Sequence, residues 1–165
     1  MEVQVHPLVH SALEKYGLVY QVLPCDPALA DTAEFCAHYG FSLSQSSNTI
    51  IVALKGNPPS FVCCVVLATT KLDVNKKLRE VTGKKGSFAS MDETKEQTGM
   101  EIGGVVAIGV EHMPIYVDSE VFSQKEIIMG GGNRTSKLLL DPHELEKIPE
   151  LQIIAGLAIP KNSGI

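Results

Sequence analysis

The chain has 165 residues, of which 44% are hydrophobic and 20% charged, and it carries a net charge of −5. This size and balance are typical of one globular domain that buries a core without disulfides or metals, and they exclude a disordered chain. The negative charge argues against a protein that coats long stretches of nucleic acid, although a small footprint with a local basic patch stays open. We therefore expect a single domain over residues 1–165.

The cysteines and the N-terminus bear on where the protein works. Cys25, Cys36, Cys63 and Cys64 form no Cys-x-x-Cys pair, and the last two lie side by side in an apolar run, where they would point to opposite faces of a strand. We interpret all four as small buried hydrophobic residues in a reducing compartment. Residues 1–4 do not open a signal peptide, and no apolar stretch is long enough to span a membrane. We expect a cytoplasmic protein without a membrane partner.

The first half of the chain predicts two helices and then a pair of strands. Caps, a proline at a first turn and glycine stops delimit the helices, and runs rich in β-branched residues indicate the strands. The run 61–68 is apolar throughout, as expected of a strand covered on both faces, and a turn rich in glycine and proline joins it to the run before it, so the two should pair as a hairpin. In chain order the predicted elements are a helix over 7–17, a strand over 19–23, a helix over 31–40, and strands over 48–54 and 61–68.

The second half mixes helices and strands in the same way. Asp73 is a helix cap, Ser90 opens a capping box, and Asp141, followed by a proline and an acid, begins another helix. The tail 151–159 fits a strand or a helix equally. Because helices and strands do not alternate strictly, the pattern favours an α+β fold, in which helices pack around a mixed sheet. In chain order the predicted elements are helices over 73–83 and 90–99, strands over 105–110, 113–118, 125–129 and 138–140, and a helix from 141.

Motifs for the commonest catalytic chemistries are missing. The chain has no Gly-x-Ser-x-Gly elbow, no phosphate-binding loop ending in Gly-Lys-Ser/Thr and no His-Glu-x-x-His. His6 and His10 are four positions apart and could share a metal, but such histidines are more often solvated, and we predict no metal and no cofactor. Nothing marks a histidine as the partner of a nucleophilic Cys25. Asp118 ends a strand, where it is either a catalytic carboxylate or, more simply, a cap on the next turn.

Two glycine-rich segments are the strongest candidates for a functional site. Residues 103–109 read Gly-Gly-Val-Val-Ala-Ile-Gly, and residues 130–134 read Gly-Gly-Gly-Asn-Arg. Successive N–H groups in such turns can converge on an anion or a polarised carbonyl oxygen, but a tight turn that needs positive φ explains the glycines equally well. Arg134 could bind a phosphate or a carboxylate through two hydrogen bonds. A strand rather than a helix follows the second segment, which disfavours a nucleotide site.

Basic residues gather between positions 71 and 85. Six of them stand against Asp73 and Glu80 in a chain that is otherwise acidic. Such a run is usually a solvated helix face, and it could also be the local patch that receives a phosphate backbone. The six residues are Lys71, Lys76, Lys77, Arg79, Lys84 and Lys85.

From about Asp26 to Leu145, the order of these features resembles the YbaK/prolyl-tRNA synthetase-associated editing domains, which hydrolyse wrongly charged aminoacyl-tRNA. The resemblance rests on the order and spacing of short segments, each of which is weak alone. It implies a mixed, partly closed β-sheet surrounded by helices and a pocket for the 3′ aminoacyl-adenosine of tRNA. The matching segments are 49–52, 71–73, 98–99 with 103–104, 114–118, 130–134 and 141–145.

The reaction implied by the resemblance is cleavage of an aminoacyl ester by water, with the enzyme acting in trans. Such an ester is already activated, so the site can position a water, let the neighbouring ribose hydroxyl assist, and stabilise the oxyanion with backbone N–H groups. The implied partner is the tRNA acceptor end, and an aminoacyl-tRNA synthetase is a further candidate partner. The candidate catalytic residues are Asn48, Gly103, Gly104 and Gly109, and the candidate substrate-binding residues are Thr49, Thr98, Ala107, Gly130, Gly131, Gly132, Arg134 and Lys137.

Four positions depart from the pattern of the family. Asn48 stands where editing members typically have a lysine, Ala107 where a proline is common, and Gly130 and Lys137 where some members have a serine and an aspartate. Asparagine can hydrogen-bond a ribose hydroxyl but cannot neutralise a phosphate, whereas Lys137 could restore the positive charge from another wall of the pocket. Three functions therefore stay open: an editing hydrolase, a silent homologue that binds a tRNA end or a protein partner, and a pocket for another small ligand.

Overall fold

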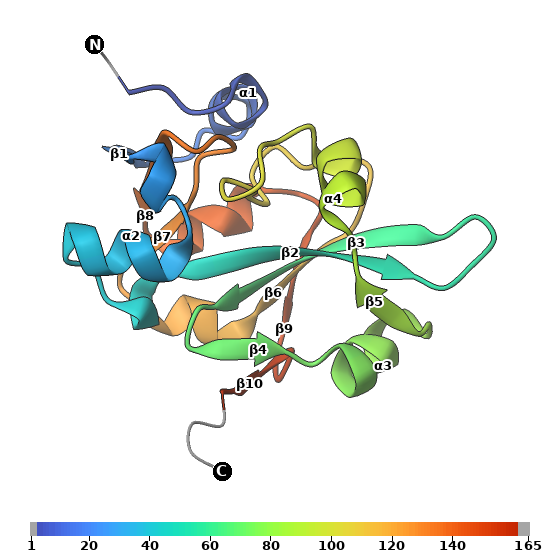
Figure 1. The fold of residues 1–165 in the computed structure, drawn as a ribbon. Helices are drawn as coiled ribbons and strands as arrows, with labels where there is room; N and C mark the ends of the chain where they lie inside the picture. Colours follow the sequence, from blue (N-terminus) through green and yellow to red (C-terminus); the bar gives the residue numbers. More distant parts are fainter. Residues whose placement is uncertain (1–2, 162–165) are drawn as a thin grey trace.

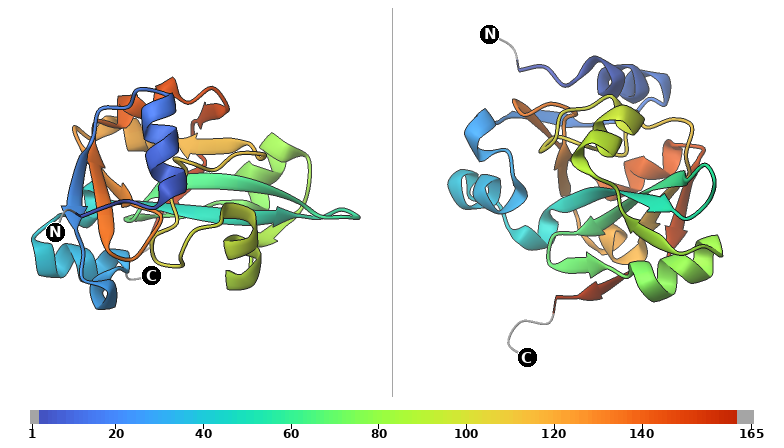
Figure 2. Two further views of the ribbon diagram at one scale, coloured as in Figure 1. Left: turned by 90° about the horizontal axis from the view of Figure 1, so that it is seen from above. Right: turned by 45° about the vertical axis from the view of Figure 1, so that its right-hand side comes forward.

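The computed structural model describes residues 3–161, so the ends of the predicted domain over 1–165 lie outside the described residues. A five-stranded mixed sheet is the centre of the fold (Figure 1). Its strand order is β5-β2-β3-β6-β9, with antiparallel pairing from β5 to β3 and parallel pairing from β3 to β9. The predicted hairpin is confirmed, and its tip projects from the body of the molecule (Figure 2). The strands are β2 (Ser47–Leu54), β3 (Ser60–Leu67), β5 (Gly86–Phe88), β6 (Ile115–Asp118) and β9 (Leu151–Ile154).

A three-stranded antiparallel sheet, in the order β1-β8-β7, stands against the beginning of β2. A parallel bridge joins Ser46 to Ile128, and the Ser47 hydroxyl donates to the Ile128 carbonyl oxygen at 3.2 Å. These contacts partly close the two sheets around a common core, as the resemblance implied. The strands of this sheet are β1 (Gln21–Pro24), β7 (Ile127–Gly130) and β8 (Ser136–Leu140), and a separate pair is formed by β4 (Thr70–Leu72) and β10 (Ala158–Pro160).

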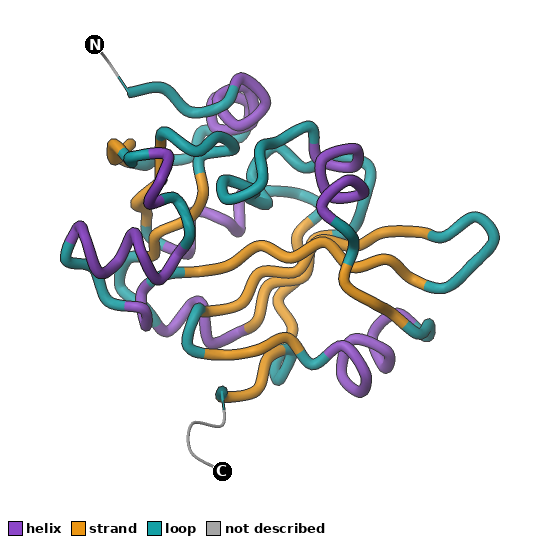
Figure 3. The backbone as a smooth tube through the Cα atoms, viewed as in Figure 1, coloured by secondary structure: helices purple, strands orange, loops and turns teal. Residues whose placement is uncertain are grey.

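Helices surround the sheets, and most begin and end at the predicted signals (Figure 3). Ser90 and Glu93 make both hydrogen bonds of a capping box, and Gly40 and Gly99 end their helices in the left-handed conformation. No helix within residues 3–161 is long and apolar enough to cross a membrane. The α-helices are α1 (Pro7–Lys15), α2 (Thr32–Tyr39), α3 (Arg79–Thr82) and α4 (Met91–Thr98), and the tighter or wider turns are η1 (Pro27–Leu29), η2 (Leu43–Gln45), η3 (Val74–Leu78), η4 (Ser119–Ser123) and η5 (Pro142–Lys147).

The strand predicted over 105–110 is wrong. This segment is a buried loop, in which Val106, Ala107 and Ile108 are fully covered but pair with no strand. The segment is apolar because it is buried, not because it is a strand. A turn closed by the hydrogen bond from the Val110 N–H to the Ala107 carbonyl oxygen prevents an extended backbone here. The ambiguous tail forms two short strands, β9 and β10. Strands β4 and β5, three residues each, carried no recognisable signal.

The main sheet has a buried core on each face. Cys63 and Cys64 point to opposite faces and both are completely buried, which confirms the prediction for this pair. Burial raises the pKa of both thiols, that of Cys64 to about 12, so they behave as apolar side chains. The larger core fills the space between the two sheets. Helix α1 covers it and contributes side chains to it, among them that of Leu13.

Candidate active site

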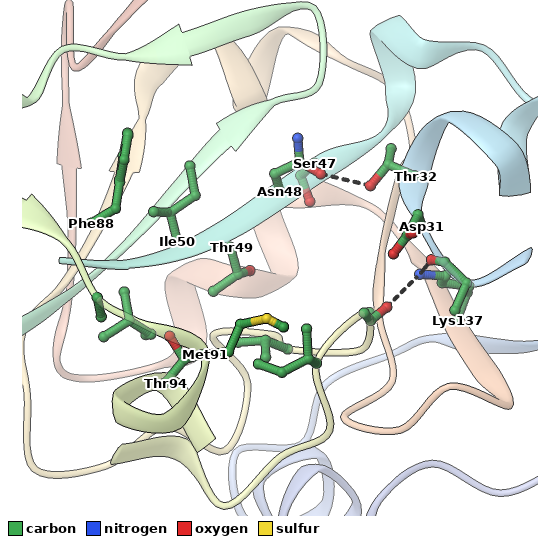
Figure 4. Close-up of a pocket in the computed structure, with 17 residues that line it drawn as sticks. Asp31, Thr32, Ser47, Asn48, Thr49, Ile50, Phe88, Met91, Thr94 and Lys137 are labelled. Atoms are coloured by element: carbon green, nitrogen blue, oxygen red, sulfur yellow. Dashed lines mark hydrogen bonds between the residues drawn. The ribbon is translucent and has the colours of Figure 1, made fainter. Parts of the chain in front are cut away.

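A cavity of about 390 Å³ opens between β2, β5, α2, α4 and the two glycine-rich segments. It has a polar end and a mainly apolar end (Figure 4). Asp31, Thr32, Asn48 and Lys137 lie at the polar end, and Thr49 lies between the two ends. The other end is lined by Ile50, Phe88, Met91 and Thr94. The cavity therefore offers polar groups to one part of a ligand and an apolar wall to another.

Asn48 lies near the start of β2, where the strand is bridged to the second sheet through its neighbours. Its Oδ1 atom accepts a hydrogen bond of 2.7 Å from the hydroxyl of Thr32, at the first turn of α2. The amide nitrogen of Asn48 has no acceptor among residues 3–161. This side chain is thus held in place at one atom and free to donate at the other.

Lys137 is the cation of the cavity. Its side chain comes from β8 and is only 6% exposed, yet no carboxylate lies at ion-pair distance among the described residues. The ammonium donates instead to the carbonyl oxygens of Ala30 at 2.6 Å and Gly103 at 3.2 Å, and it lies 5.6 Å from the centre of the Phe35 ring. Burial lowers the pKa of Lys137. A buried ammonium with only neutral partners is poised to bind a further oxygen, because it has three N–H donors.

Gly103 presents backbone to the cavity. It sits in a tight turn with φ of 91°, a conformation that favours glycine. The carbonyl oxygen of Ile102 accepts from Arg134 at 2.9 Å, and that of Gly103 accepts from Lys137. The N–H of Gly103 donates to no residue within 3–161. Side chains of the scaffold therefore hold the carbonyl groups, whereas this N–H has no partner among the described residues.

Gly104 has a different task from its neighbour. Its N–H donates to the Glu101 carbonyl oxygen at 3.0 Å, and its own carbonyl oxygen accepts from the Gly132 N–H at 2.7 Å, so both groups are engaged within the chain. A Cβ on Gly104 would overlap the backbone of Asn133, and one on Gly130 would overlap the carbonyl of Gly104. We call this backbone contact between Gly104, Gly130 and Asn133 the loop seam. Its glycines permit the two segments to touch.

Arg134 braces the cavity from outside. Its Nε and Nη2 atoms donate to the Pro27 carbonyl oxygen at 3.0 and 2.7 Å, and its Nη1 atom donates to that of Ile102. The carboxylate of Asp31 lies 3.8 Å away. All of these partners belong to the chain itself, so the structure gives Arg134 a bracing role between two loops, and phosphate binding by it stays a prediction.

Five other predicted residues do not line the cavity. Gly109 packs against the Leu8 backbone of α1, Ala107 is in the core, and Thr98 ends α4 with its hydroxyl bonded to Thr94. Gly131 and Gly132 approach Ser136 and His6. The cavity does contain Asn48, Thr49, Gly103, Gly130 and Lys137.

Asp31, Thr32 and Phe88 were missed as site residues. Asp31 was predicted only as a helix cap, but its side chain makes no capping bond and lines the cavity. A cap residue followed by a threonine was the one available signal, whereas nothing in the sequence distinguished Phe88. Asp118 lies away from the cavity, is 1% exposed, and accepts from the Ala158 N–H at 3.4 Å.

The histidine pair makes no joint site. His6 caps α1 by accepting from the Leu8 N–H at 3.1 Å, and His10 pairs with Glu14 at 3.1 Å. Within residues 3–161 no cluster of three or more potential metal ligands occurs.

A family model and a relative of known sequence each match most of the chain. The family model of the aminoacyl-tRNA editing domain matches residues 26–148. The uncharacterized protein YwhH of Bacillus subtilis (strain 168) is 34% identical over 109 residues, which are 66% of this chain and 68% of that protein.

Two solved structures share the fold. The crystal structure of the hypothetical protein APE2540 has a TM-score of 0.81 at 26% identity, covering 92% of this chain and 99% of that one. A candidate trans-editing enzyme for prolyl-tRNA synthetase has a TM-score of 0.78 at 22% identity, covering 92% and 98%. By the family match over residues 26–148, the chain belongs to the aminoacyl-tRNA editing domain family.

Proposed function

We propose that the protein hydrolyses the ester of a mischarged aminoacyl-tRNA, acting in trans. The observation that carries the proposal is the shared cavity of Asn48, Gly103 and Lys137, in a chain that belongs to the editing family. These groups come from three separate segments and offer an amide, a free N–H and a buried ammonium to one ligand. Such a set suits an ester whose carbonyl oxygen gains charge during the reaction.

The chemistry follows from the nature of the ester. Water attacks the carbonyl carbon, the C–O bond to the ribose breaks, and the ribose oxygen leaves with a proton, which the neighbouring ribose hydroxyl can relay. In this proposal the N–H of Gly103 and the remaining N–H of Lys137 stabilise the oxyanion of the tetrahedral intermediate. Both donors are held by the scaffold before substrate arrives, so little reorganisation is needed during the reaction.

In this proposal Asn48 orients a ribose hydroxyl or the attacking water and does not neutralise a phosphate. Its Oδ1 atom is engaged by Thr32, which leaves its amide N–H groups for a ribose hydroxyl or the attacking water. The carboxylate of Asp31, 67% exposed at the polar end, is suited to the α-ammonium group of the aminoacyl moiety. The positive charge that a lysine at position 48 would supply comes in this proposal from Lys137.

A deacylation assay with a panel of mischarged tRNAs tests the proposal. The wild type should release the amino acid from at least one member of the panel faster than buffer alone, and Gly83→Ala, at a residue that does not line the cavity, should behave like wild type. Asn48→Lys should still hydrolyse that substrate, because Lys137 already supplies the charge. Binding of tRNA ends without hydrolysis of any substrate would replace this proposal by the silent homologue. The absence of both binding and hydrolysis would favour another small ligand.

A further inference from the structure

Strand β5 is a common wall of three hollows on one side of the molecule. Phe88, at its end, lines both the cavity described above and a second hollow of about 590 Å³ that contains Lys71. Gly86 and Ser87 line this second hollow and also a third, of about 410 Å³, that contains Lys55 and Lys85. In Figure 1, β5 connects α3 to α4. We call the second and third hollows, which share Gly86 and Ser87, the furrow. A long ligand that leaves the cavity past Phe88 enters this furrow.

Phe88 is unusual for its exposure. It is 63% exposed on an edge strand, and Ile159 on the opposite side of the second hollow is 40% exposed. A single exposed phenylalanine needs no explanation by itself, but here it forms the rim between a cavity and a furrow. An aromatic ring in this position is a platform on which an unpaired base can stack, and such stacking tolerates any base.

The furrow has three lysines against one carboxylate. Lys71 and Asp73 line the second hollow, where Asp73 accepts from the Lys76 N–H at 3.2 Å. Lys85 is beside Lys55 in the third, because the Lys55 N–H donates to the Lys85 carbonyl oxygen at 2.8 Å. All three lysine side chains are exposed, and no ion pair engages them among residues 3–161. In the neighbouring helix only Lys77 is paired, with Glu80 at 3.8 Å. Free cations beside an aromatic platform are what a phosphate backbone with unpaired bases requires.

The other sides of the cavity have more acidic residues, and this favours an exit over β5. The α4 side carries Asp92, Glu93 and Glu96 against Lys95, and the α2 side carries Asp31 and Glu34 with Arg134 3.8 Å from Asp31. A polyanion that leaves over α2 or α4 would meet like charges, whereas over β5 it meets opposite ones.

We propose that the unpaired 3′ strand of the tRNA leaves the cavity past Phe88 and crosses the furrow, with a base stacked on Phe88 and phosphates beside Lys71, Lys85 and Lys55. The identity of the nucleic acid rests on the proposed function, but the surface itself does not. A protein with an acidic surface would also meet the charges, but the position of Phe88 at the rim of the cavity favours a strand whose end lies inside that cavity.

Binding of unfractionated, uncharged tRNA tests the surface without any reaction. Phe88→Ala should weaken binding about tenfold, and a Lys71→Glu, Lys85→Glu double variant should weaken it more and flatten the dependence on salt. The matched controls are Leu43→Ala, which removes an exposed apolar side chain elsewhere, and Lys125→Glu, which lines none of the three hollows. Thermal unfolding should show all variants folded, since each altered side chain is exposed.

The outcomes separate this inference from the proposed function. Wild-type binding that Phe88→Ala and the double lysine variant weaken, with the controls unchanged, supports the furrow even if no mischarged tRNA is hydrolysed. Equal binding by all variants overturns it, even if hydrolysis is efficient, and so does a wild type that does not bind tRNA. A short 3′-aminoacyl-adenosine, which has no phosphate chain, should be hydrolysed equally by wild type and the double lysine variant. A loss with this small substrate would place the lysines in the cavity chemistry and overturn their assignment to the furrow.

Discussion

The loop seam and the wall of the cavity lie one residue apart, yet glycine serves them differently. Gly103 lines the cavity and has an N–H that no described residue accepts, whereas both polar backbone groups of Gly104 are bonded within the chain. The seam needs glycine because Gly104 and Gly130 touch backbone across the two segments. A glycine-rich segment is therefore not one functional unit. Changes in the seam should alter stability first, and changes in the wall should alter chemistry first.

The largest effect is expected from Gly104→Ala. Its Cβ would overlap the backbone of Asn133, which cannot move aside like a flexible side chain, so unfolding should become easier by about 3 kcal/mol. Gly83→Ala is the matched control, because it has positive φ but no atom within 4 Å, and it should cost about 1 kcal/mol. Urea denaturation followed by circular dichroism measures both. Equal costs would mean that the seam is not tightly packed.

Lys137→Met should give the converse result. Losing the ammonium should lower kcat/KM for deacylation about 100-fold, as with removal of an oxyanion donor. The unfolding free energy should change by less than about 1.5 kcal/mol, because relief from burying a charge offsets the two carbonyl groups left without a donor. A variant that is as active as wild type would remove Lys137 from the proposed mechanism.

The pH dependence of deacylation is a second test of the role of Lys137. Since burial lowers the pKa of Lys137, enzymatic deacylation, corrected for spontaneous hydrolysis, should fall as pH rises through that lowered pKa, below the ordinary range of lysine. The fall should be absent in Lys137→Met.

Arg134→Lys separates bracing from binding. One ammonium cannot reproduce three donors to two carbonyl groups, so the unfolding free energy should drop by about 1–2 kcal/mol. The value of kcat should stay within about threefold of wild type if the guanidinium only braces the loops. Steady-state kinetics together with urea denaturation provides both numbers. A large rise in KM at unchanged stability would instead assign Arg134 to substrate binding.

Asp118 is a buried charge outside the cavity and sharpens the comparison with Lys137. Its Oδ2 atom has no hydrogen-bond partner among the described residues, and burial raises the pKa of this carboxyl group. The unfolded chain then ionises at lower pH than the folded one, so wild-type stability should fall as pH rises from the unfolded pKa through the folded pKa, and level off above it. Asp118→Asn should remove this fall and leave deacylation unchanged. Unfolding measured in a series of buffers from just below the ordinary pKa of an aspartate up to neutral pH tests it.

The sequence was most informative where local chemistry decides structure. Caps and glycine stops located α2 and α4, and the apolar run of β3 predicted a strand buried on both faces. The loop at 105–110 was misassigned because its burial comes from packing against distant elements.

The site was predicted in part, for a related reason. Asn48, Gly103 and Lys137 were found through their order in the chain, which a family shares. Phe88 and Thr32 were not, since their role depends on how β5 and α2 are placed beside β2, and that placement is set by contacts far apart in sequence. The duties of Gly103 and Gly104 could be separated only once their hydrogen bonds were known.

The N-terminal segment holds the second glycine-rich segment from outside the stretch that matches the family. The His6 N–H donates to the Gly131 carbonyl oxygen at 2.8 Å, and the carbonyl oxygen of Gln4 accepts from the Asn133 side chain at 3.0 Å. A fragment cut to residues 26–148 would include every residue that lines the cavity. It would nevertheless lose the N-terminal segment, whose hydrogen bonds hold the second glycine-rich segment in place. The boundary of a family match is thus not the boundary of the part that folds and functions. An affinity tag placed close to Gln4 would disturb the same hydrogen bonds.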